Sequence, residues 1–390
     1  MISLSSLLDN DFYKFTMQQC VVKLFPKAKA RYRFINRGRH VFPAGFADAL
    51  RDSINSMSSL GLTKEEKQWL CTSCPYLDPV YLDFLQGYSY DPSEISIKQN
   101  GGDLDVSIEG YWYRTILWEV PLLSLISENF YTLQNTDRLS NEEIIVRTKN
   151  KIEAYDNMNV TIAEFGTRRR HSFEVHELVV QTLKKFGKSF VGTSNVHLAR
   201  TNATKPIGTH AHEWFMFHAA KYGFKMANTM ALEHWIDVYR GELGIALSDT
   251  FTTAEFYEIF DKKFARLFDG VRHDSGDPLE FADKTIEHYQ RLGIDPLSKT
   301  IIFSDALNID KVKKIAVHCK GRIGISFGIG TNFTNDVGLN PMNIVVKMTE
   351  ALPDGEPWTP VVKLSDEPAK YTGSPETIAL AKAVLQIKNE

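Results

Sequence analysis

The feature that most constrains the fold is a change of pattern near residue 160, after which short β-branched runs alternate with helical stretches. The helical stretches include Phe173–Phe186, Thr253–Phe268 and Leu279–Leu292, and the alternation repeats every ~25–35 residues, which is typical of βαβ units and a parallel sheet. About seven or eight such units favour closure into a barrel over an open sheet. The expected strands are Val160–Phe165, Ser189–Gly192, Pro206–Thr209, Ile245–Ser248, Gly270–His273, Thr300–Phe303, Ile323–Phe327 and Asn343–Lys347.

The first part of the chain has a mixed pattern. Ala28–Asn36 alternates as a strand, whereas Thr63–Gly87 is a broken helical stretch with aromatic residues on one side. The sequence therefore predicts an α/β protein with an irregular (β/α) TIM-like barrel over residues 131–349, which carries the active site. A smaller α+β domain is expected from residues 1–130, joined by the tail at about residues 350–390.

Charge and hydropathy exclude several classes of function. The 45 basic and 48 acidic residues give a formal charge of −3, so there is no overall attraction to nucleic acid. No apolar run approaches the ~20 residues that span a bilayer. The amino-terminal segment lacks a basic region and is acidic by Asp9, which argues against a signal peptide. We expect a cytoplasmic protein that binds neither nucleic acid nor membranes.

The four cysteines are too few and too scattered for a disulfide framework. Cys71 and Cys74 have C-x-x-C spacing, but the second pair that zinc would normally need is absent. We interpret them as structural.

Polar residues follow the carboxyl ends of the expected strands with regularity, and in a barrel these ends meet at one mouth. The polar segments are Phe165-Gly166-Thr167-Arg168-Arg169-Arg170, Gly192-Thr193-Ser194-Asn195, Thr209-His210-Ala211-His212, Arg272-His273-Asp274-Ser275-Gly276-Asp277-Pro278, Ser304-Asp305 and Gly328-Ile329-Gly330-Thr331-Asn332.

The central segment contains two histidines, His210 and His212, at a strand end. Side chains two apart project to the same side, so the pair could hold a metal, relay a proton or offer an imidazole nucleophile. An isolated His-x-His is more often a surface or capping pair, and a helical zinc-protease motif is excluded because the next histidine is His218. The neighbouring segments are what favour a functional interpretation.

The neighbouring segments supply complementary chemistry. Phe165 beside Arg168 offers a face for a flat ring and a fork for a carboxylate or phosphate. Asp274 and Asp277 suit the hydroxyls of a sugar or a hydrated Mg²⁺, although this segment alone would be only a turn. Glycines in Gly328–Thr331 free backbone N–H groups for a phosphate. Together the segments suit a phosphorylated sugar joined to a small aromatic acid.

The chain closely resembles the bacterial nicotinate phosphoribosyltransferases over essentially its full length. The family's fold, a smaller α/β domain built from both chain ends beside an irregular α/β barrel, agrees with the pattern above. The motifs that carry the resemblance are Asp9–Met17, Phe34–Arg37, Trp118–Leu122, Glu164–Arg170, Gly192–Asn195, Gly208-Thr209 with His212-Glu213, His273–Pro278 and Phe327–Asn332.

The resemblance implies a reaction of nicotinate with phosphoribosyl pyrophosphate that gives nicotinate mononucleotide and pyrophosphate. It also implies coupling to ATP hydrolysis through a phosphohistidine, with ATP as co-substrate and Mg²⁺ as cofactor whose ligands stay unassigned. By motif position the phosphohistidine is His212. A homodimer is expected, with active sites shared across the interface.

The same resemblance assigns the substrate contacts. Phe165 and a partner subunit's Tyr13 would stack on the pyridine ring, and Arg168 would hold the ring or a phosphate. Arg272 and Asp274 would act at the ribose. The remaining contacts implied are Arg37 reaching across the dimer to phosphate, Thr193 and Ser194 at the substrate, and Gly328, Gly330 and Thr331 at the 5′-phosphate.

Ser194 bears on substrate choice. Related nicotinamide enzymes have an aspartate at this place, which can accept from an amide but would repel a nicotinate carboxylate. Serine, and the lack of an added basic cluster, argue against nicotinamide- and quinolinate-using relatives. The sequence pattern leaves open two further functions, a metal-dependent barrel hydrolase that uses His210 and His212 and a non-catalytic nucleotide-binding protein.

Overall fold

The computed structural model describes residues 2–387 of the 390-residue chain, and over this range the chain forms two sheets. The larger has seven strands in the order β6-β5-β4-β10-β9-β8-β7, and every neighbouring pair is parallel. The expected alternation is thus confirmed for seven of the eight runs. The strands are β4 (Thr161–Glu164), β5 (Phe190–Thr193), β6 (Lys205–Pro206), β7 (Ile245–Leu247), β8 (Gly270–His273), β9 (Thr300–Phe303) and β10 (Gly324–Ile329).

The second sheet is antiparallel, with the order β12-β11-β1-β3-β2. Its strands are β1 (Lys29–Asn36), β2 (Ile95–Asn100), β3 (Asp103–Tyr111), β11 (Ile344–Leu352) and β12 (Thr359–Pro360). The prediction that Asn343–Lys347 forms a barrel strand is wrong. These residues belong mostly to β11, which pairs with β1 in the antiparallel sheet. A β-branched run indicates extended backbone but not which strand it pairs with. The domain boundaries proposed from the sequence stay predictions.

Helices flank both sheets. They are α1 (Phe12–Leu24), α2 (Phe46–Ser56), α3 (Lys64–Ser73), α4 (Pro79–Gln86), α5 (Trp112–Thr115), α6 (Glu119–Gln134), α7 (Asn141–Met158), α8 (Phe173–Phe186), α9 (Val196–Thr201), α10 (His212–Tyr222), α11 (Phe224–Tyr239), α12 (Thr253–Ile259), α13 (Lys262–Leu267), α14 (Pro278–Arg291), α15 (Ile309–Cys319), α16 (Thr331–Thr334) and α17 (Pro375–Leu385). Over residues 2–387, none of them has the length and apolar character that crossing a membrane requires.

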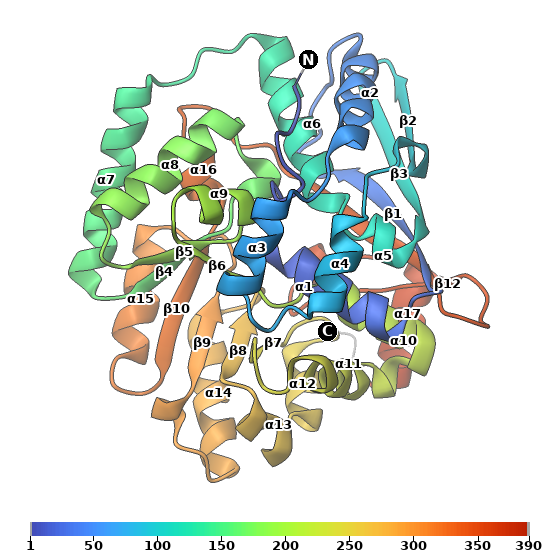
Figure 1. Ribbon diagram of the computed structural model, residues 1–390. Helices are drawn as coiled ribbons and strands as arrows, with labels where there is room; N and C mark the ends of the chain where they lie inside the picture. Colours follow the sequence, from blue (N-terminus) through green and yellow to red (C-terminus); the bar gives the residue numbers. More distant parts are fainter. Residues whose placement is uncertain (1, 388–390) are drawn as a thin grey trace.

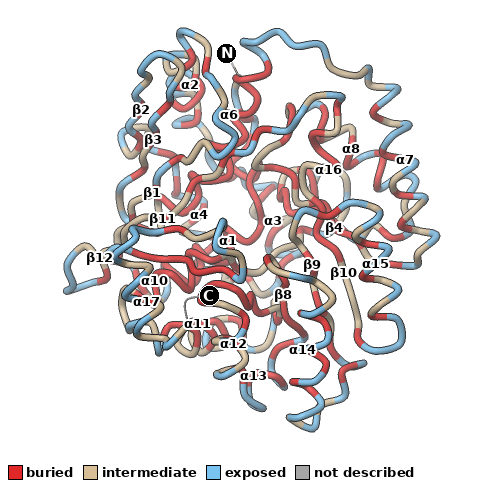
Figure 2. The backbone as a smooth tube through the Cα atoms, turned by 180° about the vertical axis from the view of Figure 1, so that it is seen from behind, coloured by how far each residue is buried: buried red, intermediate tan, exposed pale blue. Residues whose placement is uncertain are grey.

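The helices differ in how much of their surface is buried. In Figure 1, α7, α8, α14 and α15 lie on the outer side of the parallel strands. In contrast, α1, α6 and α10 are buried over most of their length, as the red tube in Figure 2 shows. A helix that is apolar nearly all round belongs in the interior. Both α6 and α10 contact β11 of the antiparallel sheet.

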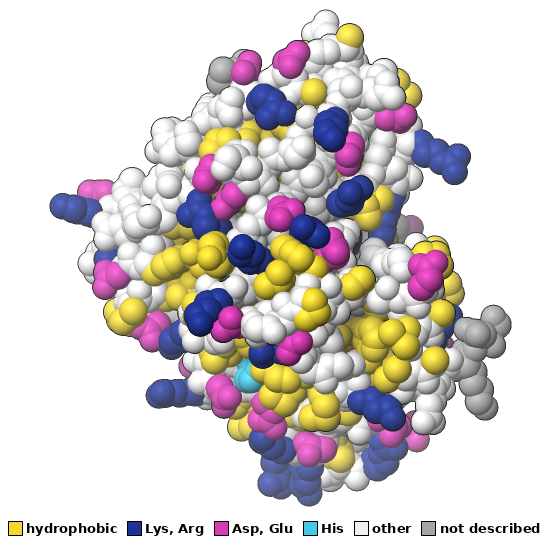
Figure 3. All heavy atoms as spheres, turned by 90° about the vertical axis from the view of Figure 1, so that its right-hand side faces the viewer, with side chains coloured by type: hydrophobic (Ala, Val, Ile, Leu, Met, Phe, Trp, Pro, Cys, Tyr) yellow, Lys and Arg dark blue, Asp and Glu magenta, His cyan; other side chains and the backbone are white. Residues whose placement is uncertain are grey.

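The outer surface carries charges of both signs. In Figure 3, basic and acidic side chains are interspersed with apolar ones on the face shown. This face therefore has no single-sign field of the kind that attracts nucleic acid.

The two ends of the parallel sheet meet at a seam, where no backbone ladder joins β6 to β7 within residues 2–387. Side chains bridge it instead. Thr209 Oγ1 donates to the carbonyl of Ile245 (3.2 Å), and the N–H of Leu247 donates to Nε2 of His210 (3.1 Å). Burial, together with the positive charge of Arg272, lowers the pKa of His210 well below its ordinary value, so the ring stays neutral and can accept. His210 is therefore a residue of the seam, and the hydrolase alternative loses one of its two ligands.

Arg170, in the segment that follows β4, binds the amino-terminal segment and α6. Its Nη1 and Nη2 donate to the two carboxylate oxygens of Asp9 (2.7 and 2.8 Å), and its Nε donates to Glu128 (2.7 Å). Burial alone would raise the pKa of Asp9, but Arg170 and a hydrogen bond from Asn195 hold it below its ordinary value. All three charges lie out of water, so each depends on the others.

Replacing Arg170 by methionine should lower the free energy of unfolding by about 3–5 kcal/mol, because two carboxylates would stay buried without a cation. Urea denaturation measures this loss. The matched control is Arg147→Met, which removes a half-exposed arginine paired with Asp336 and should cost about 1 kcal/mol or less. Equal losses in the two variants would contradict the structural role of Arg170.

Candidate active site

A cavity of about 850 Å³ is lined by the carboxyl ends of the parallel strands, by β11 and by the start of α10. This volume falls in the range of small-molecule sites. The predicted site residues on its wall are Tyr13, Arg37, Phe165, Arg168, His212, Arg272, Asp274, Gly328, Gly330 and Thr331. Loops that are far apart in the sequence therefore meet at one cavity.

His212 is the first residue of α10, and both of its ring nitrogens have partners. Nδ1 lies 3.1 Å from Oγ1 of Thr250, and Nε2 lies 3.1 Å from Oδ2 of Asp274 and 3.0 Å from Nζ of Lys363. Burial, helped by Lys363, lowers the pKa of His212 to about 4 although the nearby carboxylates oppose this. The imidazole is therefore neutral at neutral pH and keeps a lone pair on one ring nitrogen.

Asp249 completes a cluster around His212. Its Oδ1 lies 3.7 Å from His212 Nε2, and ligand atoms of His212, Asp249 and Asp274 all lie within 4.8 Å of one another. Asp249 is buried, and its Oδ1 has no hydrogen-bond partner in the described part of the chain. Two carboxylates with a free buried oxygen are the kind of donor set that hard divalent cations prefer.

Asp274 is held in its ionised form by the groups around it. Ser304 Oγ donates to its Oδ1 (2.7 Å), and Arg272 Nη2 lies 3.9 Å from its Oδ2. Burial would raise the pKa of Asp274, but Arg272, His212 and Lys363 together hold it well below the ordinary value. Arg272 is itself oriented by donating from Nη1 to the carbonyl of His210 (3.1 Å).

Two aromatic residues, Phe165 and Tyr13, line another part of the wall, which is called the aromatic slot. The ring of Phe165 lies against Gly328, where a Cβ would come within 3.2 Å of it. Tyr13 and Arg168 lie close enough to influence each other's ionisation, and the buried Tyr13 hydroxyl has no partner among residues 2–387. Tyr13 lines the cavity of its own chain, and the stacking of a partner subunit's Tyr13 on the ring stays a prediction.

Comparison with known proteins covers both parts of the chain. Residues 8–127 match the nicotinate phosphoribosyltransferase (NAPRTase) N-terminal domain, and residues 160–389 match the nicotinate phosphoribosyltransferase (NAPRTase) family.

The chain belongs to the nicotinate phosphoribosyltransferase family.

Individual relatives agree over nearly the whole length. A nicotinate phosphoribosyltransferase of Chromohalobacter salexigens is 63% identical over 98% of this chain and 99% of its own, and one of Desulforapulum autotrophicum is 48% identical over the same shares. The crystal structure of the Porphyromonas gingivalis enzyme superposes with a TM-score of 0.96 at 45% identity, covering 98% of this chain and 100% of that one. The crystal structure of the Vibrio cholerae enzyme superposes with a TM-score of 0.93 at 34% identity, covering 99% of this chain and 95% of that one.

Two residues assigned to the substrate of this phosphoribosyltransferase do not reach the cavity wall. Thr193 Oγ1 donates to the buried carboxylate of Glu164 (2.5 Å), and Ser194 Oγ donates to Asp11 (2.7 Å). Both are fully buried. Neither side chain lines the cavity, because a residue at a strand end can point inward to the core as readily as to the mouth, and their contact with substrate stays a prediction. Burial raises the pKa of Asp11, and the charge of Arg168 and the Ser194 bond oppose this.

A buried charge network forms part of the cavity wall of this enzyme. Lys14 Nζ contacts Glu119 (2.5 Å) and Glu213, and Tyr32 donates to the other oxygen of Glu213 (2.7 Å). Burial would raise the pKa of Glu119, but Lys14 is the main reason that it falls to about 2. Glu213 follows His212 in the chain, so this network fixes the start of α10.

Several functional residues were missed in the sequence. Asp249 follows β7, and the rule that polar residues follow barrel strands would have found it. Lys347 and Lys363 come from the strand and tail after the barrel, where no motif marks them. Burial lowers the pKa of Lys347 to about 8. Arg169 also lines the cavity, and burial and the charges of its arginine neighbours lower its pKa to about 10.

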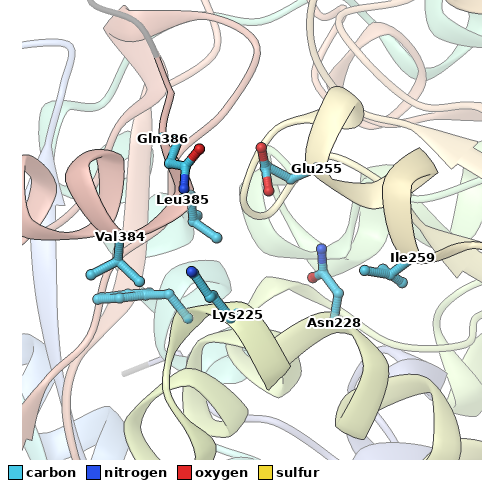
Figure 4. Close-up of a pocket in the computed structure, with 8 residues that line it drawn as sticks. Lys225, Asn228, Glu255, Ile259, Val384, Leu385 and Gln386 are labelled. Atoms are coloured by element: carbon cyan, nitrogen blue, oxygen red, sulfur yellow. The ribbon is translucent and has the colours of Figure 1, made fainter.

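A second, smaller cleft of about 170 Å³ lies between α11, α12 and α17 (Figure 4). Its polar groups come from Lys225, Asn228, Glu255 and Gln386. It shares no lining residue with the larger cavity and is not part of the active site.

Replacing Lys14 by methionine should destabilise the protein by about 3–5 kcal/mol near neutral pH, since two carboxylates would lose their cation. Without Lys14 the main charge that opposes burial is lost, so the folded-state pKa of Glu119 should rise, with only Arg168 and Lys347 still opposing burial. The variant's loss of unfolding free energy is then largest at high pH and becomes smaller as Glu119 is protonated. The difference in free energy of unfolding between the wild type and the variant should therefore narrow from about pH 7 to about pH 5. Thermal unfolding across this range measures it. Lys284→Met, which breaks an exposed pair with Glu280, is the control and should show no such narrowing.

Proposed function

We propose that this enzyme joins nicotinate to phosphoribosyl pyrophosphate, giving nicotinate mononucleotide and pyrophosphate, as a step of NAD biosynthesis. The observation that carries the proposal is one cavity that combines the aromatic slot, several arginines and the His212 cluster in a chain matched over its length by this family. The nicotinamide-using and hydrolytic functions have no comparable support.

Binding roles follow from position on the wall. The pyridine ring would lie in the slot between Phe165 and Tyr13, with Arg168 close to its carboxylate. The sugar would lie near Arg272 and Asp274. The backbone of Gly328, Gly330 and Thr331 would hold the 5′-phosphate. Arg37, Arg169 and Lys347 have no ion-pair partner among the described residues, which supports a role for them beside pyrophosphate.

The transfer itself needs no protein nucleophile. The bond from ribose C1 to pyrophosphate breaks, the leaving oxygen keeps the electron pair, and the pyridine nitrogen forms the new bond to C1. The cavity acts by holding ring and sugar in line and by placing cations such as Arg37 and Arg169 where the leaving charge develops. Burial of the site excludes water that would otherwise capture C1.

The acidic pair near His212 fits a magnesium ion. Asp249 offers a free buried oxygen, and Asp274 is held ionised, so both could bind a hard cation. Mg²⁺ at this place would neutralise phosphate charge and orient the phosphate groups. We propose the carboxylate of Asp274 as its protein ligand, since the free oxygen of Asp249 faces His212 Nε2.

ATP coupling through His212 is the second part of the proposal. One ring nitrogen of the neutral imidazole would attack the γ-phosphorus, the bond to the β-phosphate oxygen would break, and ADP would leave with the electron pair. Water would later release phosphate. A phosphoryl group at the cavity wall adds negative charge beside Lys363 and can order nearby loops towards tighter substrate binding.

We also infer an irregular TIM-like barrel, a homodimer and a cytoplasmic location. The side-chain seam between β6 and β7 supports the barrel. The dimer and the location rest on the family resemblance and the sequence.

Incubation with γ-labelled ATP should label the wild type with acid-labile phosphate, and His212→Ala should take up none. ATP should stimulate nicotinate turnover by about 5–150-fold, the range of a typical coupling energy, and His212→Ala should lose this stimulation. His318→Ala, which alters a partly exposed histidine paired with Asp283, is the control. Undiminished labelling of His212→Ala would reject the role of His212.

Substrate choice can be tested at Ser194. The change Ser194→Asp places a second carboxylate beside Asp11 and near Arg168, so kcat/KM for nicotinate should fall by about 10-fold or more relative to that for nicotinamide. The control Ser194→Ala removes the hydroxyl without adding charge and should change this ratio less. Unchanged selectivity in Ser194→Asp would contradict the assignment of Arg168 to the carboxylate.

A further inference from the structure

Ser275 has no part in the reaction proposed above, yet its hydrogen bonds are fully determined. It is buried, its Oγ accepts from the N–H of Asp366 (3.2 Å), and it donates to Oδ2 of Asp249 (2.7 Å). A backbone N–H can only donate and a carboxylate can only accept, so the hydroxyl proton has one position. The hydroxyl therefore joins the tail of the chain to the His212 cluster.

The tail reaches Ser275 through a loop, residues 363–372, which we call the tail loop. Lys363 and Thr372 close it with two backbone hydrogen bonds of 3.0 Å. The loop is anchored to the segments that follow three parallel strands, β7, β8 and β9. Its anchors are Asp366 accepting from Thr253 N–H (2.8 Å), Glu367 accepting from Gly276 N–H (2.8 Å) and Lys370 donating to Asp305 (2.7 Å).

All the donors to Asp249 converge on one of its oxygens. Besides Ser275, Oδ2 receives Lys363 Nζ (3.2 Å) and Ser365 Oγ (3.4 Å), both from the tail loop. The other oxygen, Oδ1, is the unpartnered one that lies 3.7 Å from His212 Nε2. Holding Oδ2 in this way turns Oδ1 towards the imidazole.

We propose that Ser275 is a positioning residue that transmits the placement of the tail loop to Asp249 and so aims Asp249 Oδ1 at His212 for phosphorylation. The inference rests on the proposed phosphohistidine. When the ring nitrogen bonds to phosphorus and ADP leaves, the imidazole gains positive charge, and a carboxylate already aimed at it stabilises that state. Ser275 acts through Asp249 and does not touch the reacting atoms.

The test is the single-turnover rate of labelling from γ-labelled ATP, measured over a range of ATP concentrations. Ser275→Ala should lower the maximal rate by about 10-fold, the worth of a hydrogen bond to a charged group, with the half-saturating ATP concentration unchanged. Ser275→Thr keeps the hydroxyl and should stay within about 2-fold of the wild type. Ser326→Ala, which removes a hydroxyl bound to the Thr161 carbonyl in the barrel wall, should match the wild type.

Each other outcome overturns the inference. These are an unchanged maximal rate in Ser275→Ala, an equal loss in Ser275→Thr, or an effect confined to the half-saturating ATP concentration. If Ser275→Ala does not fold, Ser275→Cys tests the inference in its place. A thiol is a weak donor, so the maximal rate of this variant should be lower than that of Ser275→Thr but reduced by less than about 10-fold relative to the wild type. A wild type that takes up no label contradicts the phosphohistidine itself, and this is seen before any variant is compared.

A second readout uses the ring-nitrogen NMR signals of His212 in the unphosphorylated protein. Ser275→Ala and Asp249→Asn should move these signals in the same direction, since both take a carboxylate oxygen away from the ring. Ser326→Ala should leave them in place. Signals that stay fixed in Ser275→Ala overturn the positioning role.

Discussion

The structure depends on the buried contact of Lys14 with Glu119 and Glu213. These residues come from α1, α6 and α10, so one ammonium group joins three helices that no backbone ladder connects. Charges out of water are tolerated only when paired, and the pairing leaves little freedom of position. Because Glu213 follows His212 directly, the contact that stabilises the interior also sets the place of the imidazole.

The three consecutive arginines show how burial divides similar residues between structure and chemistry. Arg170 faces the interior, where Asp9 and Glu128 neutralise it. Arg168 and Arg169 line the cavity, and the nearest carboxylate to Arg168 is Glu119 at 3.6 Å. Arginines at the wall keep donors available for an anionic substrate, whereas the fully paired one serves only the fold. Their sequence pattern alone does not distinguish these roles.

Much of the fold and the site could be predicted because barrel chemistry is confined to strand ends. This rule located His212, Arg272 and Asp274. It does not separate the cavity residues from Ser194 and His210, which lie off the cavity wall, since alternation along a strand does not say which face is the mouth when the strand is two to four residues long. Lys363 was not predictable, because it comes from a tail loop whose contacts depend on tertiary packing. The placement of Asn343–Lys347 failed for the same reason.

The seam between β6 and β7 also has a mechanical consequence. Elsewhere the parallel strands are joined by backbone ladders, but here two side-chain hydrogen bonds, from Thr209 and to His210, span the gap. Separating these edges costs less free energy than parting any other neighbouring strands. The segment that leads into His212 therefore starts at the most weakly joined pair of neighbouring strands among residues 2–387.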